Sequence, residues 1–134
     1  MTSVRKELQH WTPSTVGKLS RTKGHAWERE VAGMLRHAGD PSAARNLEEV
    51  RYGNSGDIIC DRFPLIVQCK TGKRPPIYTG LAEAIEASKG TGKIPMLVAH
   101  RDAPKPFTDA DNLAVFRLDD IIDLFRELHE IGHW

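Results

Sequence analysis

Residues 56–70 read GDIICDRFPLIVQCK and predict two antiparallel strands joined by a tight connection. The first apolar run is Ile58 to Cys60, and the second is Leu65 to Lys70. Both runs are short, rich in β-branched residues and bounded by turn-forming residues, as is typical of strands. Side chains alternate between the two faces of a strand, so Gln68 and Lys70 are expected on the same face of the second strand.

The rest of the chain alternates helix-like and strand-like segments. We expect helices at 25–37, 81–89 and 118–131, further strands at 47–52, 94–100 and 113–117, and loops at 71–80 and 101–112. This order predicts an α/β fold, in which a central mixed sheet is flanked by helices. Residues 1–22 have no sustained period, and we expect a basic, flexible N-terminal arm before a single domain of residues 23–134.

Length and composition are those of one ordinary globular domain. The chain has 134 residues, of which 40% are hydrophobic and 28% are charged. It contains no apolar run of the roughly 18 residues that a membrane-spanning helix needs, and its first residues lack the apolar region of a secretory signal. Cys60 and Cys69 have no pairing pattern, so we expect reduced cysteines in a cytoplasmic protein with no membrane partner.

Polar residues from three segments are predicted to meet at one end of the sheet. Asp57 follows a glycine-bearing turn, and antiparallel pairing brings it near Gln68 and Lys70. Glu28 lies at the edge of the apolar stripe of the first helix and can face the sheet. Carboxylate oxygens hold Mg²⁺ or Mn²⁺, and a nearby lysine can orient the attacking water in phosphodiester hydrolysis. Each residue alone is more often a turn, helix-start or surface residue, so the prediction depends on their convergence.

The distribution of charge suits a polyanionic ligand. Residues 1–105 carry 17 Lys and Arg against 11 Asp and Glu, whereas residues 106–134 carry 2 against 7. Phosphate contacts by basic side chains supply much of the affinity of proteins for nucleic acid. The candidate DNA-binding residues flank the predicted site and are Lys23, Arg51, Ser55, Lys73 and Arg74. A generic solubilising surface is the alternative interpretation of these residues.

Several short motifs, in this order and spacing, resemble the archaeal-type Holliday junction resolvases. They are Lys23-Gly24, Trp27-Glu28-Arg29-Glu30-Val31, Arg51-Tyr52-Gly53-Asn54-Ser55-Gly56-Asp57, Val67-Gln68-Cys69-Lys70, Tyr78-Thr79-Gly80 and Gly92-Lys93-Ile94-Pro95-Met96-Leu97-Val98-Ala99. The resemblance implies a PD-(D/E)XK core, a homodimer, Mg²⁺, and paired nicks across four-way junctions in DNA recombination and repair. By position, Glu28 matches the helix carboxylate of that family, Asp57 its central metal ligand and Lys70 its catalytic lysine. Glu30 is the alternative to Glu28 if the helix is rotated.

The sequence departs from that family at Gln68, where the family has glutamate. An amide oxygen can still bind a hard cation, but it brings no charge. The Val-Gln-Cys-Lys string is similar to Mrr-type restriction endonucleases, in which glutamine is usual at this place. We therefore predict an active nuclease, with Asp57, Gln68 and Glu28 as metal ligands and branched DNA as substrate. A restriction-like or general endonuclease, and a catalytically weak branched-DNA-binding module, remain as alternatives.

A competing motif lies at the C-terminus. His129-Glu130-Ile131-Gly132-His133 spells H-E-x-x-H, the pattern of zinc metalloproteases, which requires both histidines on one helix face. Gly132 favours the end of a helix inside this motif. We therefore expect an exposed helix end rather than a zinc protease.

Overall fold

The computed structural model describes residues 13–47, 56–102, 106 and 108–132. Its elements are α2 (Pro13–Ala38), β1 (Ala44–Arg45), β2 (Ile58–Ile59), β3 (Leu65–Gly72), α4 (Ile77–Ser88), β4 (Ile94–Arg101), the 3-10 turn η1 (Asp109–Asp111), β5 (Asn112–Val115) and α5 (Leu118–Glu130). The strands form one sheet in the order β1-β2-β3-β4-β5. Only the β3–β4 pair is parallel, and the other neighbours are antiparallel. The predicted α/β fold with a mixed sheet is confirmed.

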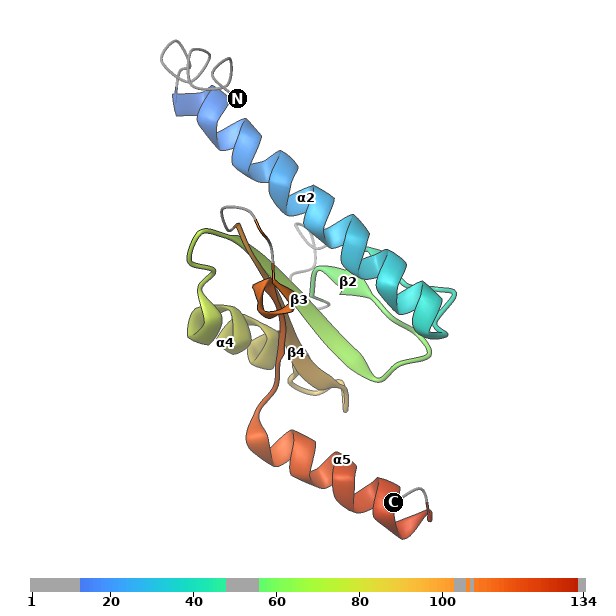
Figure 1. The fold of residues 1–134 in the computed structure, drawn as a ribbon. Coiled ribbons are helices and arrows are strands. Elements are labelled where there is room, and N and C mark those ends of the chain that lie inside the picture. Colours follow the sequence, from blue (N-terminus) through green and yellow to red (C-terminus); the bar gives the residue numbers. More distant parts are fainter. Residues whose placement is uncertain (1–12, 48–55, 103–105, 107, 133–134) are drawn as a thin grey trace.

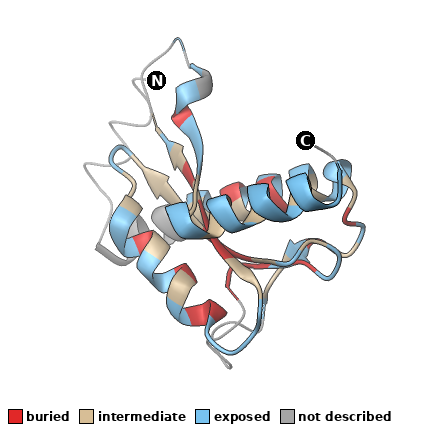
Figure 2. Cartoon of the chain, turned by 90° about the horizontal axis from the view of Figure 1, so that it is seen from below, coloured by how far each residue is buried: buried red, intermediate tan, exposed pale blue. Residues whose placement is uncertain are grey.

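Two helices cover opposite faces of the sheet (Figure 1). The face toward α2 carries Val67 and Cys69 of β3, which pack in the main apolar cluster with Trp27. The indole Nε1 of Trp27 also donates a hydrogen bond of 3.1 Å to the carbonyl of Val98 on β4, so it ties the helix to the sheet. The opposite face of β3 is covered by α4, the crossover helix between the two parallel strands. Figure 2 shows buried residues concentrated on the sheet and on the sides of the helices that face it.

Helix α2 is longer than the sequence predicted. It begins at Pro13 rather than near His25, and proline is favoured at the first helical position because its φ is already helical. Figure 1 shows that the N-terminal part of α2 projects beyond the sheet. A projecting segment needs no apolar stripe, which explains why residues 13–22 show no helical period. Residues 1–12 of the predicted arm lie outside the described residues.

The strand that pairs with β2 also differs from the expectation. It is the short β1, Ala44–Arg45, and the predicted strand 47–52 falls largely on residues 48–55, outside the described residues. Leu47 itself is in a turn and is exposed, so it does not begin a buried strand. The predicted antiparallel pairing of β2 with β3 is confirmed, and β1 is also antiparallel to β2.

The predicted loop 71–80 is shorter in the structure. β3 continues to Gly72, and α4 begins at Ile77 directly after the Pro75-Pro76 pair, so only residues 73–76 connect them. The second proline is the N-cap of α4, where its missing N–H costs no helical hydrogen bond. The first turn of α4 contains Gly80. Because glycine has a low helix propensity, the sequence did not indicate that the helix begins before this residue.

Candidate active site

Asp57 is held against β3 by backbone geometry. Its amide donates a hydrogen bond of 2.7 Å to the carbonyl of Val67, and its Oδ2 accepts one of 2.7 Å from the amide of Cys69. Ile58 pairs with Val67, and continuing this antiparallel register places Asp57 opposite Gln68. Asp57 is 7% exposed, and its second oxygen, Oδ1, has no hydrogen-bond partner among the described residues. One oxygen is therefore fixed while the other can bind a ligand.

The turn before Asp57 requires glycine. Gly56 has φ +72, and a Cβ at this position would lie 2.7 Å from the carbonyl oxygen of Val67. Such a contact is too short for any side chain, so the close approach of the turn to β3 depends on Gly56. This approach is what brings the Asp57 carboxylate to the amide of Cys69.

Gln68 and Lys70 share the face of β3 that α4 covers, as predicted, and both contact Glu83. The Gln68 Nε2 donates a hydrogen bond of 3.1 Å to the Glu83 Oε2. The Lys70 Nζ lies 2.8 Å from the same oxygen. Gln68 is buried, whereas the side chains of Lys70 and Glu83 are 27% and 42% exposed. Two side chains of β3 and one carboxylate of α4 therefore form one polar group, which solvent reaches from the α4 side.

Gly80 sets the distance between α4 and the sheet. A Cβ at this position would lie 2.8 Å from Cδ1 of Leu97 and 3.0 Å from Cγ of Lys70. Because Leu97 is fully buried, it has little freedom to move away. Glu83 follows one helical turn after Gly80, so the same close approach delivers its carboxylate to Lys70.

Glu28 lies on α2, which packs on the other face of the sheet. Its Oε2 accepts a hydrogen bond of 2.9 Å from Nε of Arg45 on β1, and the two side chains are 19% and 22% exposed. No contact among the described residues joins Glu28 to Asp57, Gln68 or Lys70. Its role as a metal ligand stays a prediction, as does that of Glu30, which is exposed on the same helix.

Glu83 was not predicted from the sequence as a member of this group. Its position near the start of a helix carries no motif, and the helix was expected to begin only at Leu81. The available signal was the crossover itself, because a helix joining two parallel strands packs back on the sheet near the strand that precedes it. Arg45 was missed for a different reason, since the strand that carries it was predicted later in the chain.

The chemistry of these side chains fits a hard divalent cation. Mg²⁺ and Mn²⁺ prefer oxygen ligands, which Asp57, Gln68 and Glu83 offer. Within the ranges that the structure describes, no three His, Cys, Asp or Glu side chains gather as a ready metal cluster. An amide oxygen, water or a substrate phosphate would therefore complete the ligand set, as is usual for Mg²⁺.

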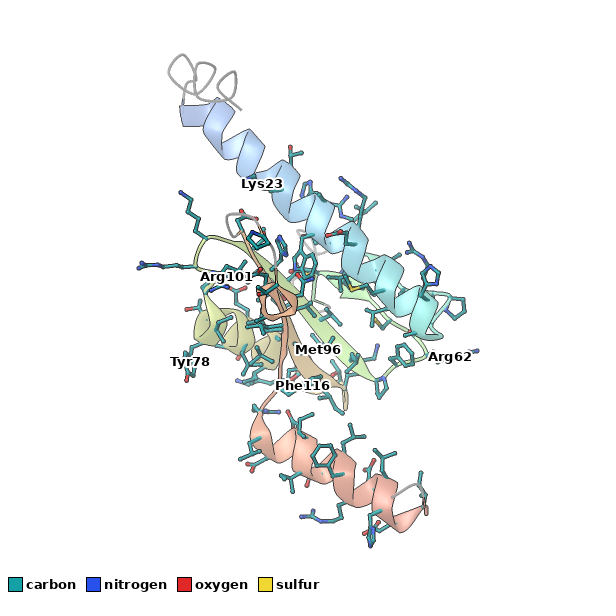
Figure 3. All side chains as sticks on the ribbon, viewed as in Figure 1. Lys23, Arg62, Tyr78, Met96, Arg101 and Phe116 are labelled. Atoms are coloured by element: carbon teal, nitrogen blue, oxygen red, sulfur yellow. The ribbon has the colours of Figure 1, made fainter. Side chains whose placement is uncertain are left out.

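Basic side chains gather at the end of the sheet where β3 and β4 finish. Lys23 of α2 lies 3.6 Å from Asp102, whose amide donates to the carbonyl of Gly72. Lys73 and Arg74 follow Gly72 directly and are exposed. Figure 3 shows Lys23 and Arg101 at this end of the molecule and Arg62 away from it. Arg51 and Ser55 of the predicted DNA-binding set lie outside the described residues.

Two acidic residues near the sheet serve structure. Asp40 is buried and accepts hydrogen bonds from the hydroxyl of Ser42 and from the amides of Arg62 and Phe63, and these hydrogen bonds lower its pKa to about 2. Asp111 accepts from the amide of Thr108 and pairs with the guanidinium of Arg101 at 2.7 Å, which lowers its pKa. Both carboxylates are saturated by protein donors, so neither is available to a cation.

The C-terminal H-E-x-x-H pattern does not continue one helix. α5 ends at Glu130, and Gly132 has φ +83, which is outside the helical region. His133 lies outside the described residues. Among the helices of the described residues, none is both long and apolar enough to cross a membrane.

Comparison with protein families gives one match. Residues 19–127 match the family model described as "Phage putative PDDEXK endonuclease". The match confirms the PD-(D/E)XK superfamily that the motifs predicted, but it does not single out the archaeal-type resolvases. No curated protein and no solved structure matches the chain significantly.

Proposed function

Because the chain belongs to the family of phage PDDEXK endonucleases, we propose that it is a metal-dependent nuclease that cuts branched DNA, above all four-way junctions. The observation that carries this proposal is the register of β2 and β3, which places Asp57 opposite Gln68, while Gln68 and Lys70 share one face of β3. The nearby basic residues Lys23, Lys73 and Arg74 support a phosphate backbone as the ligand.

Each residue has a role in phosphodiester hydrolysis. Asp57 and Gln68 would hold the cation, and Glu28 would support the site from α2. Water oxygen bonds to phosphorus as the water gives up a proton, the bond from phosphorus to one ester oxygen breaks, and that leaving oxygen takes up a proton. Lys70 orients the attacking water and offsets the charge that grows on the phosphate. A bound Mg²⁺ or Mn²⁺ supplies Lewis-acid stabilisation of the same charge.

A homodimer follows from the substrate, since paired nicks need two sites. The candidate surface is α5, which has no buried residue although its apolar set includes Leu118, Ile122 and, just beyond the helix, Ile131. Figure 1 shows α5 set apart from the sheet, so this face does not serve the core of its own subunit. A second copy of α5 would cover it. We expect Ile122→Glu to convert a dimer to a monomer in sedimentation, and a parent that is already monomeric contradicts the dimer.

The decisive assay compares a labelled four-way junction with a linear duplex of the same arm sequence, each in Mg²⁺ and Mn²⁺ with protein in excess. We expect paired symmetric nicks in the junction alone. Equal cutting of both substrates would favour a restriction-like endonuclease. Binding without cutting, even in Mn²⁺, would favour a DNA-binding module.

Two variants test the site itself. Asp57→Asn and Lys70→Ala should abolish cutting while junction binding survives, because the phosphate contacts are made elsewhere. The control is Lys89→Ala, which removes an exposed lysine at the end of α4 whose described ion pair is with Glu86. Cutting by either site variant at the parental rate would refute the assignment.

A further inference from the structure

Position 68 leaves the proposed site short of negative charge. Among the described residues, Asp57, directly before β2, is the carboxylate that the strand connection brings to this site, and Gln68 is neutral. Mg²⁺ is usually bound through one or two carboxylates together with phosphate and water. Glu28 makes no described hydrogen bond or ion pair with the group and is paired with Arg45, so it would add little negative charge there. A second carboxylate must therefore come from another element if the cation is to bind firmly before DNA does.

Glu83 occupies that place. Its Oε2 is held from two directions, by Lys70 Nζ at 2.8 Å and by Gln68 Nε2 at 3.1 Å. Its other oxygen, Oε1, makes no hydrogen bond or ion pair with any described residue. The arrangement repeats that of Asp57, in which one oxygen is fixed by β3 and the other is open. Glu83 contacts Gln68 directly and Asp57 lies opposite it in the strand register, so each carboxylate near Gln68 keeps one oxygen without a described partner.

The Glu83 contacts differ from those of an ordinary surface ion pair. Glu86, one turn later on α4, pairs with Lys89 at 2.7 Å, but both side chains are highly exposed and belong to neighbouring turns. Glu83 instead joins two elements and contacts a buried amide. Gly80 maintains this contact, because any larger residue there would push α4 away from Lys70 and Leu97. A glycine inside a helix lowers helix stability, and here it allows the close approach that places Glu83.

We propose that Glu83 is the second carboxylate ligand of the cation site, replacing from the helix the charge that Gln68 does not supply from the strand. This inference rests on the proposed nuclease function. Gln68 and Lys70 position Glu83 through its Oε2. Oε1 of Glu83 and Oδ1 of Asp57 would be the carboxylate oxygens that hold the cation. A bound cation would compete with Lys70 for Glu83, and this competition would leave the ammonium group available to the phosphate.

The test measures Mn²⁺ binding to the full chain without DNA, by the electron paramagnetic resonance signal of free Mn²⁺. We expect Glu83→Gln to bind Mn²⁺ at least about tenfold more weakly than the parent. The matched control Glu86→Gln removes an equal charge from the same helix and should bind as the parent does. Equal Mn²⁺ affinity of Glu83→Gln and the parent would overturn the proposal.

An exchange variant guards against a simple loss of structure. Gln68→Glu with Glu83→Gln moves the carboxylate from helix to strand and preserves an amide–carboxylate pair beside Lys70. We expect it to recover Mn²⁺ affinity to within about threefold of the parent, because a strand carboxylate is an equally suitable hard ligand. A folded exchange variant that binds Mn²⁺ no better than Glu83→Gln would also overturn the proposal.

DNA cleavage separates this inference from the function on which it rests. If the parent cuts DNA and Glu83→Gln binds Mn²⁺ and cuts as well as the parent, the nuclease stands and the role of Glu83 fails. If the parent neither binds Mn²⁺ nor cuts any DNA, the proposed function fails and the Glu83 proposal fails with it.

Discussion

Gln68→Glu is the substitution whose effect the structure defines most sharply. The parental Gln68 Nε2 donates to Glu83 Oε2 across 3.1 Å, and Lys70 binds the same oxygen. Glutamate at position 68 replaces that donor with a second carboxylate oxygen. Without metal, two like charges then face each other at a buried position with only Lys70 to balance them. With metal, the same two charges should bind the cation more tightly.

The magnitude follows from the distance. Two unit charges at this separation repel by about 5 kcal/mol at an effective dielectric constant of about 20. Glu83 is partly exposed and can turn toward water, and Lys70 attracts both carboxylates, so most of that repulsion is relieved. We expect a net loss of about 1–3 kcal/mol in the free energy of unfolding without metal, which includes the lost hydrogen bond. For a chain of this length, that loss lowers Tm by about 3–12 °C.

Thermal unfolding of the parent and Gln68→Glu, each with a chelator and with millimolar Mg²⁺, measures both effects. The variant should melt below the parent in chelator and should gain more Tm from Mg²⁺, because a tighter ligand stabilises the folded state further. Its cleavage at low Mg²⁺ should equal or exceed that of the parent. An unchanged Tm in chelator, together with an equal Mg²⁺ gain, would show that positions 68 and 83 do not face each other across a cation site.

Three further outcomes follow from the contacts. Glu28→Gln should reduce cleavage less than Asp57→Asn, because Glu28 is paired with Arg45 on the other face, and a complete loss of Mn²⁺ binding would contradict this. The carboxyl group of Asp40 has a pKa of about 2 in the folded protein, below its ordinary pKa near 4. Its ionised form therefore contributes stability above about pH 4, and this contribution disappears as pH falls toward 2. The Tm difference between the parent and Asp40→Asn should therefore shrink across that interval, and a constant difference would oppose it. Burial raises the pKa of Cys60 to about 11, so the native protein should resist alkylation of Cys60 at pH 8 until it unfolds, which mass spectrometry of labelled peptides checks.

Local rules were sufficient for the strand part of the site. Alternation along β3 put Gln68 and Lys70 on one face, and a short antiparallel connection brought Asp57 back beside them. Both relations span few residues and depend on no distant packing. The order of elements likewise predicted the mixed sheet, since one helix must cross between the parallel strands β3 and β4.

Relations between elements were beyond the sequence. The rotation of α2 about its axis decides where Glu28 points. The hydrogen bond from Trp27 to β4 helps to set this rotation. The contact between Glu83 and Lys70 depends on how closely α4 approaches the sheet, which a single glycine controls. Neither quantity leaves a periodic signal, because each is the result of packing between residues far apart in the chain.

The neutral residue at 68 and the carboxylate at 83 explain each other electrostatically. With both positions acidic, Asp57 would add a third negative charge around one lysine, and the metal-free protein would bear the repulsion. With both positions neutral, Lys70 would lose its carboxylate partner, and the proposed cation site would lose a ligand. With a carboxylate at only one of the two positions, Asp57 and Glu83 carry two negative charges and Lys70 carries one positive charge. The protein can tolerate this balance without metal, and a divalent cation can still neutralise it. The helix is the more adaptable location, because Glu83 is partly exposed and can turn between Lys70 and the cation, whereas position 68 is buried and fixed.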